Sequence, residues 1–233
     1  MDFLSGQTLL FNKPKGWTSF DVVKKVRNII RIKKVGHAGT LDPLATGLLI
    51  LCTGKHTKLI ETIQGQEKEY DVVFKLGATT ASYDAEYPEE NFTVATHITR
   101  ENLTSALPAF VGEIEQTPPA FSAVKVGGKR AYESARKGEP VDLKARKVMI
   151  YEFSLLEWES ESRIKARVRC SKGTYIRSLV HDLGQALGVG AYMTGLVRTR
   201  IGDYRLADAW EISDFEQKFG RPNLPSRSDL PHT

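Results

Sequence analysis

Cysteine is scarce in this chain of 233 residues, which has only Cys52 and Cys170. The two lie far apart and at no spacing typical of a metal site, so we interpret them as buried thiols in a reducing compartment. The N-terminus shows no basic stretch followed by an apolar one, which is the pattern of a signal peptide. The longest apolar run, residues 48–52, is far too short to cross a bilayer. We therefore expect a cytoplasmic protein with no membrane partner.

Motifs for nucleotide cofactors and for zinc are missing as well. The chain has no GxxxxGKS or GxxxxGKT loop, no GxGxxG after a predicted strand, and no cluster of cysteines and histidines. Its five histidines are scattered and suggest no metal site: His37, His56, His97, His181 and His232. An enzyme with this sequence would have to work with side chains alone, without a cofactor or a metal.

The composition is that of a globular protein with an ordinary core. Hydrophobic residues make up 41% of the chain and aromatic residues 9%, which is enough for one large domain. We expect this domain over residues 1–220 and a flexible tail at 221–233, where proline, serine and charged residues gather. The net charge of +5 favours a polyanionic partner without requiring one. No exposed apolar stripe demands a second copy, so a monomer is expected.

Strands and helices are predicted to alternate irregularly along the chain. Periodicity predicts strands at 7–12, 48–52, 68–76 and 164–170, an extended segment at 191–206, and helices after Thr18 and Ser19, at 56–63, at 102–110 and after a Thr174 cap. Residues 36–47 are expected to form a glycine-rich loop and residues 79–97 a surface loop. The absence of a strict strand–helix–strand repeat favours an α+β domain, with a mixed, largely antiparallel central sheet flanked by helices and loops.

Three segments are rich in basic residues. One is the outer face of the first helix and the residues after it, over 24–34. The second is the proline- and glycine-containing stretch 117–147, which we interpret as a mobile insertion that contacts phosphate. The third is the strand face formed by Lys165, Arg167 and Arg169. A single charged run is most often a solvated face. Three of them together favour contact with a nucleic-acid backbone.

Asp42, which precedes Pro43, has two interpretations. It can start a turn or cap a helix, because aspartate before proline commonly does so. It can also be a nucleophile towards an electrophilic carbon, a role that a carboxylate fills in glycosyl transfer without metal. The glycines around it permit close approach of a ligand to the backbone, and His37 lies five residues before it. From these residues alone both interpretations stay open.

Several motifs now allow a comparison with a known family. They are Lys13-Pro14 with Gly16, the run from Gly36 to Gly47 (GHAGTLDPLATG), Lys68-Glu69-Tyr70, the run from Gln116 to Lys125 with Gly128 and Ala131-Tyr132, and the run from Cys170 to Leu179. In this order they closely resemble the motifs of the bacterial tRNA pseudouridine-55 synthases, the TruB family. The resemblance spans roughly residues 9–205, and the segment 36–47 is its most specific part.

The resemblance implies a pseudouridine-synthase catalytic domain with an RNA-gripping insertion at about 117–147. The implied reaction isomerises a uridine in the T-loop of tRNA, at position 55, by breaking the N1–C1′ bond and forming a C5–C1′ bond. Asp42 is the implied nucleophile, and Arg177 is implied to hold it ionised and oriented through an ion pair. Which atom Asp42 attacks is left open by the resemblance.

Further residues receive roles from the same resemblance. Tyr70 is implied to stack on the target base and to assist in removing its C5 proton. Tyr175 and Leu196 match positions that complete the uracil pocket, and His37 is implied to occupy the space that the flipped base leaves. Lys13 is expected to shape the floor of the site. Other implied contacts to the substrate or the RNA are made by Gly39, Thr40, Lys125 and Lys172.

One feature departs from the family pattern. Members commonly carry a C-terminal RNA-binding domain of the PUA type, whereas only about 28 residues follow Arg205, too few for a second domain. The expectation is therefore a short form of the family that binds the T-loop and T-stem of tRNA. Two alternatives remain: a tRNA-folding chaperone without catalysis, and an isomerase that acts on another RNA.

Overall fold

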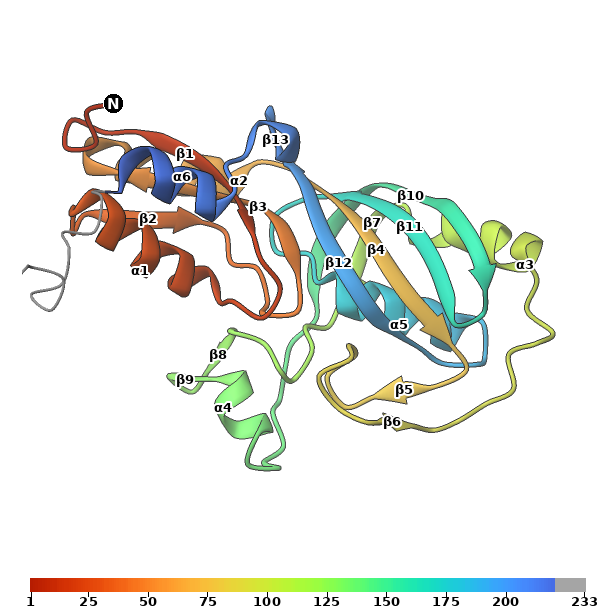
Figure 1. Ribbon diagram of the computed structural model, residues 1–233. Helices are drawn as coiled ribbons and strands as arrows, with labels where there is room; N and C mark the ends of the chain where they lie inside the picture. Colours follow the sequence, from red (N-terminus) through yellow and green to blue (C-terminus); the bar gives the residue numbers. More distant parts are fainter. Residues whose placement is uncertain (221–233) are drawn as a thin grey trace, which may run out of the picture.

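A nine-stranded sheet runs through the protein, as the computed structural model shows for residues 1–220 (Figure 1). Residues 221–233, for which a flexible tail is predicted, lie outside the described residues. Within residues 1–220, all strand pairs of this sheet are antiparallel except β3–β12. The expected α+β class with a largely antiparallel central sheet is confirmed. In spatial order the strands are β1 (Thr8–Lys13), β3 (Thr46–Thr53), β12 (Ala191–Ile201), β4 (Lys68–Leu76), β11 (Arg163–Cys170), β10 (Arg146–Ser160) and β7 (Gly112–Gln116), with β2 (Val35–Ala38) beside β3 and β13 (Tyr204–Arg205) beside β12.

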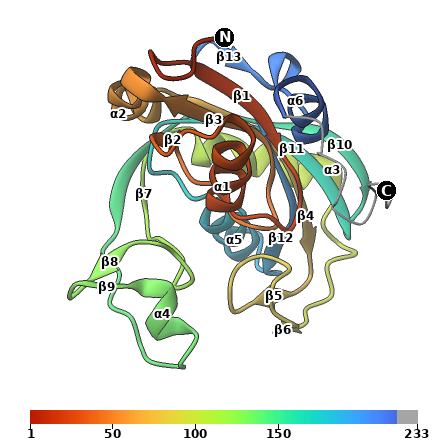
Figure 2. The same cartoon turned by 60° about the vertical axis from the view of Figure 1, so that its left-hand side comes forward.

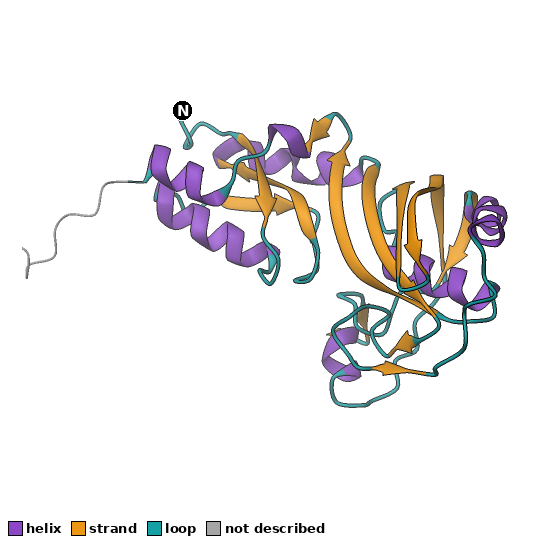
Figure 3. Ribbon diagram, turned by 45° about the vertical axis from the view of Figure 1, so that its right-hand side comes forward, coloured by secondary structure: helices purple, strands orange, loops and turns teal. Residues whose placement is uncertain are grey.

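The parallel contact between β3 and β12 joins two halves of the sheet (Figure 3). It is short, pairing Thr46 and Gly47 with Val197 and Arg198, and the rest of that edge of β3 pairs with β2. Gly47 has φ +97°, and a Cβ atom there would collide with the backbone of Arg198. A glycine is therefore required where the two halves meet. The candidate site lies at this junction.

The first half of the sheet is covered on both faces. α1 (Ser19–Ile30) begins at Thr18, whose side chain forms a capping box with Asp21. Together with α6 (Ile212–Phe219) it packs on the face of β3 that carries Leu49 and Leu51. The opposite face of β3 packs against α2 (Ile60–Gly65), which follows the 3₁₀ turn η1 (Gly54–Leu59). A strand buried on both faces explains the unbroken apolar run at 48–52.

The second half of the sheet packs one face against α5 (Ile176–Ala186). Alternate residues of β4 point into this core, including Val72 and Phe74, and they meet Leu179 and Leu183 of α5. α3 (Arg100–Ala106) and η2 (Leu107–Phe110) complete the cluster. No helix within residues 1–220 is long and apolar enough to span a membrane.

Two segments predicted to be irregular contain regular structure. Residues 79–97 hold the hairpin of β5 (Thr79–Thr80) and β6 (Glu89–Glu90), and they bury Asp84 instead of exposing it. The insertion holds the hairpin of β8 (Lys125–Val126) and β9 (Lys129–Arg130), followed by α4 (Ala131–Ala135). The predicted loop 36–47 is also shorter than expected, because its ends belong to β2 and β3.

Other differences concern the ends and edges of elements. The N-cap of α5 is Tyr175, whereas the hydroxyl of Thr174 donates to the carbonyl of Ser171. β10 and α6 have no counterpart among the sequence predictions. Three register shifts in the pairing of β10 with β11 interrupt its in–out alternation, which is the pattern from which a strand is predicted.

Candidate active site

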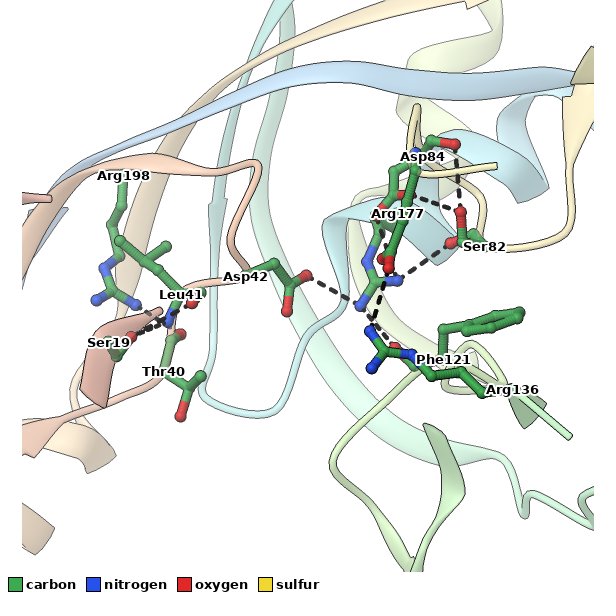
Figure 4. A network of polar contacts seen from close by, with 11 residues as sticks. Ser19, Thr40, Leu41, Asp42, Ser82, Asp84, Phe121, Arg136, Arg177 and Arg198 are labelled. Atoms are coloured by element: carbon green, nitrogen blue, oxygen red, sulfur yellow. Dashed lines mark hydrogen bonds and ion pairs between the residues drawn. The ribbon is translucent and has the colours of Figure 1, made fainter. Parts of the chain in front are cut away.

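Asp42 lies in the loop that connects β2 to β3. Its backbone forms a turn, because its carbonyl accepts a hydrogen bond from the N–H of Ala45 at 3.1 Å. Its carboxylate contacts Arg177 across the cleft instead of capping its own loop (Figure 4). The turn interpretation thus describes the backbone of Asp42, while the side chain remains available for chemistry.

Two buried side chains hold this loop in place. The hydroxyl of Ser19, at the start of α1, accepts from the N–H of Leu41 at 2.9 Å. Arg198 on β12 is 1% exposed, and its guanidinium donates to the carbonyls of Gly39 at 3.2 Å, Thr40 at 3.3 Å and Leu48 at 2.8 Å. Arg198 was not identified from the sequence, because a lone arginine in an extended segment carries no signal of such contacts.

The side chain of Lys13 contacts the backbone of the loop that carries Asp42. This side chain is buried, and its ammonium donates to the carbonyls of Trp17 at 2.6 Å, Pro14 at 3.0 Å and Pro43 at 3.4 Å. Burial lowers the pKa of Lys13 to about 8, although the nearby negative charge of Asp42 acts in the opposite direction. The role of Lys13 in shaping the floor of the site stays a prediction.

Arg177 is the second residue of α5 and makes the ion pair expected with Asp42. Its Nη2 lies 2.9 Å from the Oδ2 of Asp42; the side chain of Arg177 is 4% exposed, and that of Asp42 is 42% exposed. The same guanidinium donates to the carbonyls of Phe121 at 3.0 Å and Ser82 at 3.1 Å. Its fork is thus fixed by backbone oxygens on one side while it presents a nitrogen to the cleft.

Asp84 is a second carboxylate on the same guanidinium, 3.4 Å from Nη1. Its other oxygen accepts from the hydroxyl of Ser82 at 2.6 Å and from the N–H of Glu86 at 3.0 Å. The prediction of a surface loop at residues 79–97 is wrong for Asp84, which is buried. An acid in a segment without periodicity looks solvated, and only its arginine partner, 93 positions away, allows it to be buried.

A cavity of about 620 Å³ opens beside Asp42. Eight of the eleven predicted site residues line it: Gly39, Thr40, Asp42, Tyr70, Lys172, Tyr175, Arg177 and Leu196. Burial raises the pKa of Tyr70, so its ring stays a neutral phenol at neutral pH. The lining also contains more cations than acids, with Lys68, Arg146, Lys147, Lys172, Arg177 and Arg198 against Asp42 and Glu61. Such a cavity suits an anionic ligand with an aromatic or planar part.

The other three predicted residues do not line the cavity. Lys13 is buried and contacts backbone carbonyls, including that of Pro43 next to Asp42. His37 belongs to β2, where it pairs with Leu51; within residues 1–220 its Nδ1 is buried without a hydrogen-bond partner, and burial lowers its pKa. Lys125 is exposed on β8 of the insertion.

The basic face predicted on β11 is not a free cationic surface. Lys165 and Arg167 lie 3.5 Å and 3.0 Å from the carboxylate of Asp71 on β4, and Arg169 lies 3.6 Å from Glu67. Lys165 and Arg167 share one carboxylate, so this face is only partly neutralised, and its contact with an RNA backbone stays a prediction. The outer face of α1 differs, because within residues 1–220 no ion pair is found for Lys24 or Arg31.

Comparisons with known proteins identify the family of this chain. Residues 27–176 match the family model of the TruB family pseudouridylate synthase N-terminal domain, and residues 177–224 match that of the tRNA pseudouridylate synthase B C-terminal domain. The tRNA pseudouridine synthase B of Bacteroides thetaiotaomicron is 53% identical, over 98% of this chain and 99% of that protein. That of Flavobacterium johnsoniae is 47% identical, over 93% of this chain and 97% of that protein.

Solved structures of related proteins share the fold. The chain superposes with a TM-score of 0.72 and 29% identity on a chain of a Cbf5–Nop10–Gar1 complex, and with a TM-score of 0.69 and 26% identity on a chain of an archaeal box H/ACA Nop10–Cbf5 complex. It spans 54% of the length of each of these chains. By family model and by identity over nearly its whole length, the protein belongs to the TruB family of pseudouridylate synthases.

Proposed function

We propose that this protein converts the uridine at position 55 in the T-loop of tRNA into pseudouridine, with Asp42 as the nucleophile. The observation that carries the proposal is the half-exposed carboxylate of Asp42, which faces a cavity of nucleotide size and is held at 2.9 Å by a buried arginine. Family membership supplies the reaction class, because relatives of similar length bear the name tRNA pseudouridine synthase B.

The reaction is an isomerisation, so no co-reactant is needed. The N1–C1′ bond of the uridine breaks, the uracil turns, and C5 bonds to C1′ while the C5 proton leaves and N1 gains a proton. Asp42 acts on the sugar or the base during the break, and Arg177 orients its carboxylate through a charge-assisted contact. Because Arg177 is held by backbone carbonyls, this orientation is set before the substrate binds.

The target base must leave the RNA stack to reach Asp42, since C1′ and C5 are poorly accessible in a stacked nucleotide. Tyr70, Tyr175 and Leu196 line the cavity and provide apolar faces that suit an extruded uracil. Burial raises the pKa of Tyr70 against the opposing charge of Arg198, so its ring is a neutral phenol suited to stacking. A part in removing the C5 proton is proposed as well. His37 is proposed to fill the gap that the base leaves in the loop.

The RNA itself is proposed to lie between α1 and the insertion, which Figures 1 and 2 both place on the same side of the sheet. The outer face of α1 offers Lys24 and Arg31, together with the ring of Phe20, which is 59% exposed and lies 5.8 Å from the guanidinium of Arg27. The insertion offers Lys125. Positive charge for phosphates beside an aromatic surface is typical of RNA-binding proteins. Binding is therefore expected to weaken as salt rises.

The test is incubation with an unmodified tRNA transcript, followed by mapping of pseudouridine at single-nucleotide resolution. We expect pseudouridine at position 55, and an Asp42→Asn variant should be slower by at least about 10³-fold, as expected when a nucleophile is removed. A transcript with cytidine at position 55 is the control. Binding without any pseudouridine would overturn the proposal in favour of a folding chaperone, and pseudouridine only at other positions would change the substrate.

A further inference from the structure

Tyr83 and His181 form an aromatic stack next to the residues that make the ion pair between Arg177 and Asp84. The rings of Tyr83 and His181 are parallel to within 12°, with centroids 3.8 Å apart. Tyr83 lies between Ser82 and Asp84 in the chain, and His181 lies one helical turn after Arg177 on α5. The stack and the Arg177 contacts therefore connect the same two elements, the turn at residues 80–84 and the helix α5.

Neither ring touches the substrate cavity. Tyr83 and His181 do not line the cavity beside Asp42; they line a separate hollow of about 470 Å³ on the far side of the turn. Within the part of the chain that the structure describes, the Nδ1 of His181 is buried without a hydrogen-bond partner, and burial lowers the pKa of the ring. The contribution of this ring that the geometry shows is the packing of its face on Tyr83.

The backbone of Tyr83 adopts a conformation that needs support. Its φ is +62°, in the left-handed region that residues other than glycine rarely adopt. Hydrogen bonds hold it on both sides, from its N–H to the carbonyl of Thr80 at 3.2 Å and from the N–H of Met193 to its own carbonyl at 3.0 Å. Because Tyr83 separates Ser82 from Asp84, this conformation sets how the carbonyl of one and the carboxylate of the other approach the guanidinium of Arg177.

We propose that Tyr83 and His181 are positioning residues for the reaction at Asp42. Their stack clamps the turn 80–84 onto α5, so that Ser82 and Asp84 hold Arg177, and Arg177 holds the carboxylate of Asp42. This inference rests on the proposed function for its catalytic readout. Its structural content, that the stack sets the orientation of Arg177, is independent of the substrate.

The test separates a positioning role from a contribution to folding. Tyr83→Ala is expected to lower the single-turnover rate on saturating tRNA about ten-fold, the lower end of effects from residues that orient active-site groups. The apparent affinity for tRNA should stay unchanged, because neither ring lines the substrate cavity. Tyr83→Phe keeps the aromatic ring, so its rate should equal that of the unmodified protein. Phe110→Ala is the matched control, because it removes an aromatic pair with Phe153, in the same half of the sheet, that makes no contact with Arg177.

A double-mutant cycle tests the route of the effect. In an Asp84→Asn background the contact between the turn and Arg177 is already weakened, so adding Tyr83→Ala should change the rate less than two-fold. A ten-fold effect of Tyr83→Ala in that background would show that the stack affects the rate by a route other than the contact between Asp84 and Arg177. An unchanged rate for Tyr83→Ala, with only a lower melting temperature, would reduce the stack to a structural element. If Tyr83→Ala fails to fold, His181→Leu removes the same stack from α5.

A measurement without RNA distinguishes this inference from the proposed function. The ¹⁵N NMR signals of the Arg177 guanidinium should shift or broaden in Tyr83→Ala and remain unchanged in Phe110→Ala. Unchanged Arg177 signals in Tyr83→Ala would overturn the positioning role. Absence of pseudouridine at position 55 with the unmodified protein, while these signals still respond, would overturn the proposed function alone.

Discussion

The guanidinium of Arg177 contacts two carboxylates, of which one is buried and the other is half-exposed. On one side, Asp84 has a side chain that is 4% exposed and accepts hydrogen bonds from Ser82 and Glu86 as well as the contact from Arg177. On the other side, Asp42 is 42% exposed, and within residues 1–220 its carboxylate has Arg177 as its one polar partner (Figure 4). The two carboxylates contact the same guanidinium, but they differ in how accessible their oxygens are to a ligand.

This difference indicates how the site divides its tasks. A buried carboxylate is tolerated only when a counter-charge and hydrogen bonds replace its hydration, and Asp84 meets this condition. Such a group is inert towards substrate, but it keeps the arginine in place. Asp42 lines the cavity with a half-exposed carboxylate, as the proposed nucleophile must. Asp84 therefore stabilises the arrangement that Asp42 uses.

The largest effect is expected from removing the group that the two sides share. Arg177→Met should lower the free energy of unfolding by about 3–5 kcal/mol, since it leaves Asp84 buried without its cation. Urea denaturation measures this change. Arg136→Met is the control: the pair of Arg136 with Glu86 is exposed on both partners, and its loss should cost less than about 1 kcal/mol. Equal losses in the two variants would contradict the distinction.

Neutralising each carboxylate separately should sharpen the comparison. Asp84→Asn should lower the free energy of unfolding by about 1–3 kcal/mol, because an amide next to Arg177 compensates the buried charge poorly. It should slow product formation about 10- to 100-fold. Asp42→Asn should leave the free energy of unfolding almost unchanged and should abolish turnover almost completely. Urea denaturation and single-turnover kinetics measure the two quantities. The same rank order in both assays would show that the carboxylates do not divide the tasks.

The free energy of unfolding should depend on pH through Lys13, whose pKa is affected by the charge of Asp42. The pKa of Lys13 is about 8 in the folded protein and 10.5 in an unfolded chain. Between these values the unfolded chain binds more protons, so the contribution of Lys13 to stability rises with pH across this window, and its burial is most costly below pH 8. From pH 8 to pH 10 the unfolding free energy of the wild type should gain on the order of 1–2 kcal/mol relative to Lys13→Met.

A related measurement compares the two aspartates through Lys13. The charge of Asp42 raises the pKa of Lys13, whereas Asp84 is not among the groups that affect it. Asp42→Asn should therefore lower that pKa further and Asp84→Asn should leave it unchanged, as followed by ¹³C NMR of the lysine Cε. A shift in the Asp84→Asn variant alone would contradict the prediction.

The smallest effect is expected from charges outside the cavity. Lys24→Gln combined with Arg31→Gln should weaken tRNA binding a few-fold and reduce the slope of log affinity against log salt by about 1–2, since each phosphate contact contributes about 0.9. Lys165→Gln combined with Arg167→Gln removes the same formal charge from β11, where both side chains pair with Asp71. Filter binding at several salt concentrations compares the two. Equal slopes for both double variants would contradict an RNA path along α1.

Some elements of this fold follow from local sequence. The alternation in residues 68–76 predicts β4 with its observed bounds, and the cap at Thr18 with the buried valines predicts α1. The segment around Asp42 identifies the family and with it the ion pair to Arg177. β10 escaped prediction because its bulges break the alternation.

Other features depend on partners that are distant in sequence. Arg198 supports the loop of Asp42 from more than 150 positions away, and Asp84 is buried because Arg177 lies 93 positions later. The sequence does not show that the charges of β11 are paired, because Asp71 on β4 and Glu67 just before that strand are distant in sequence. Local periodicity reports which face of an element is apolar, and it carries no information about which charged side chain lies opposite.

The sequence by itself determined the family, the α+β class and the identity of the candidate nucleophile, because these depend on short motifs and on local hydrophobic periodicity. Only the tertiary structure decided which of two aspartates is buried and which faces the cavity. The physical reason is that ionised side chains are stabilised by neighbours that folding brings together, so their exposure is a property of the packed structure.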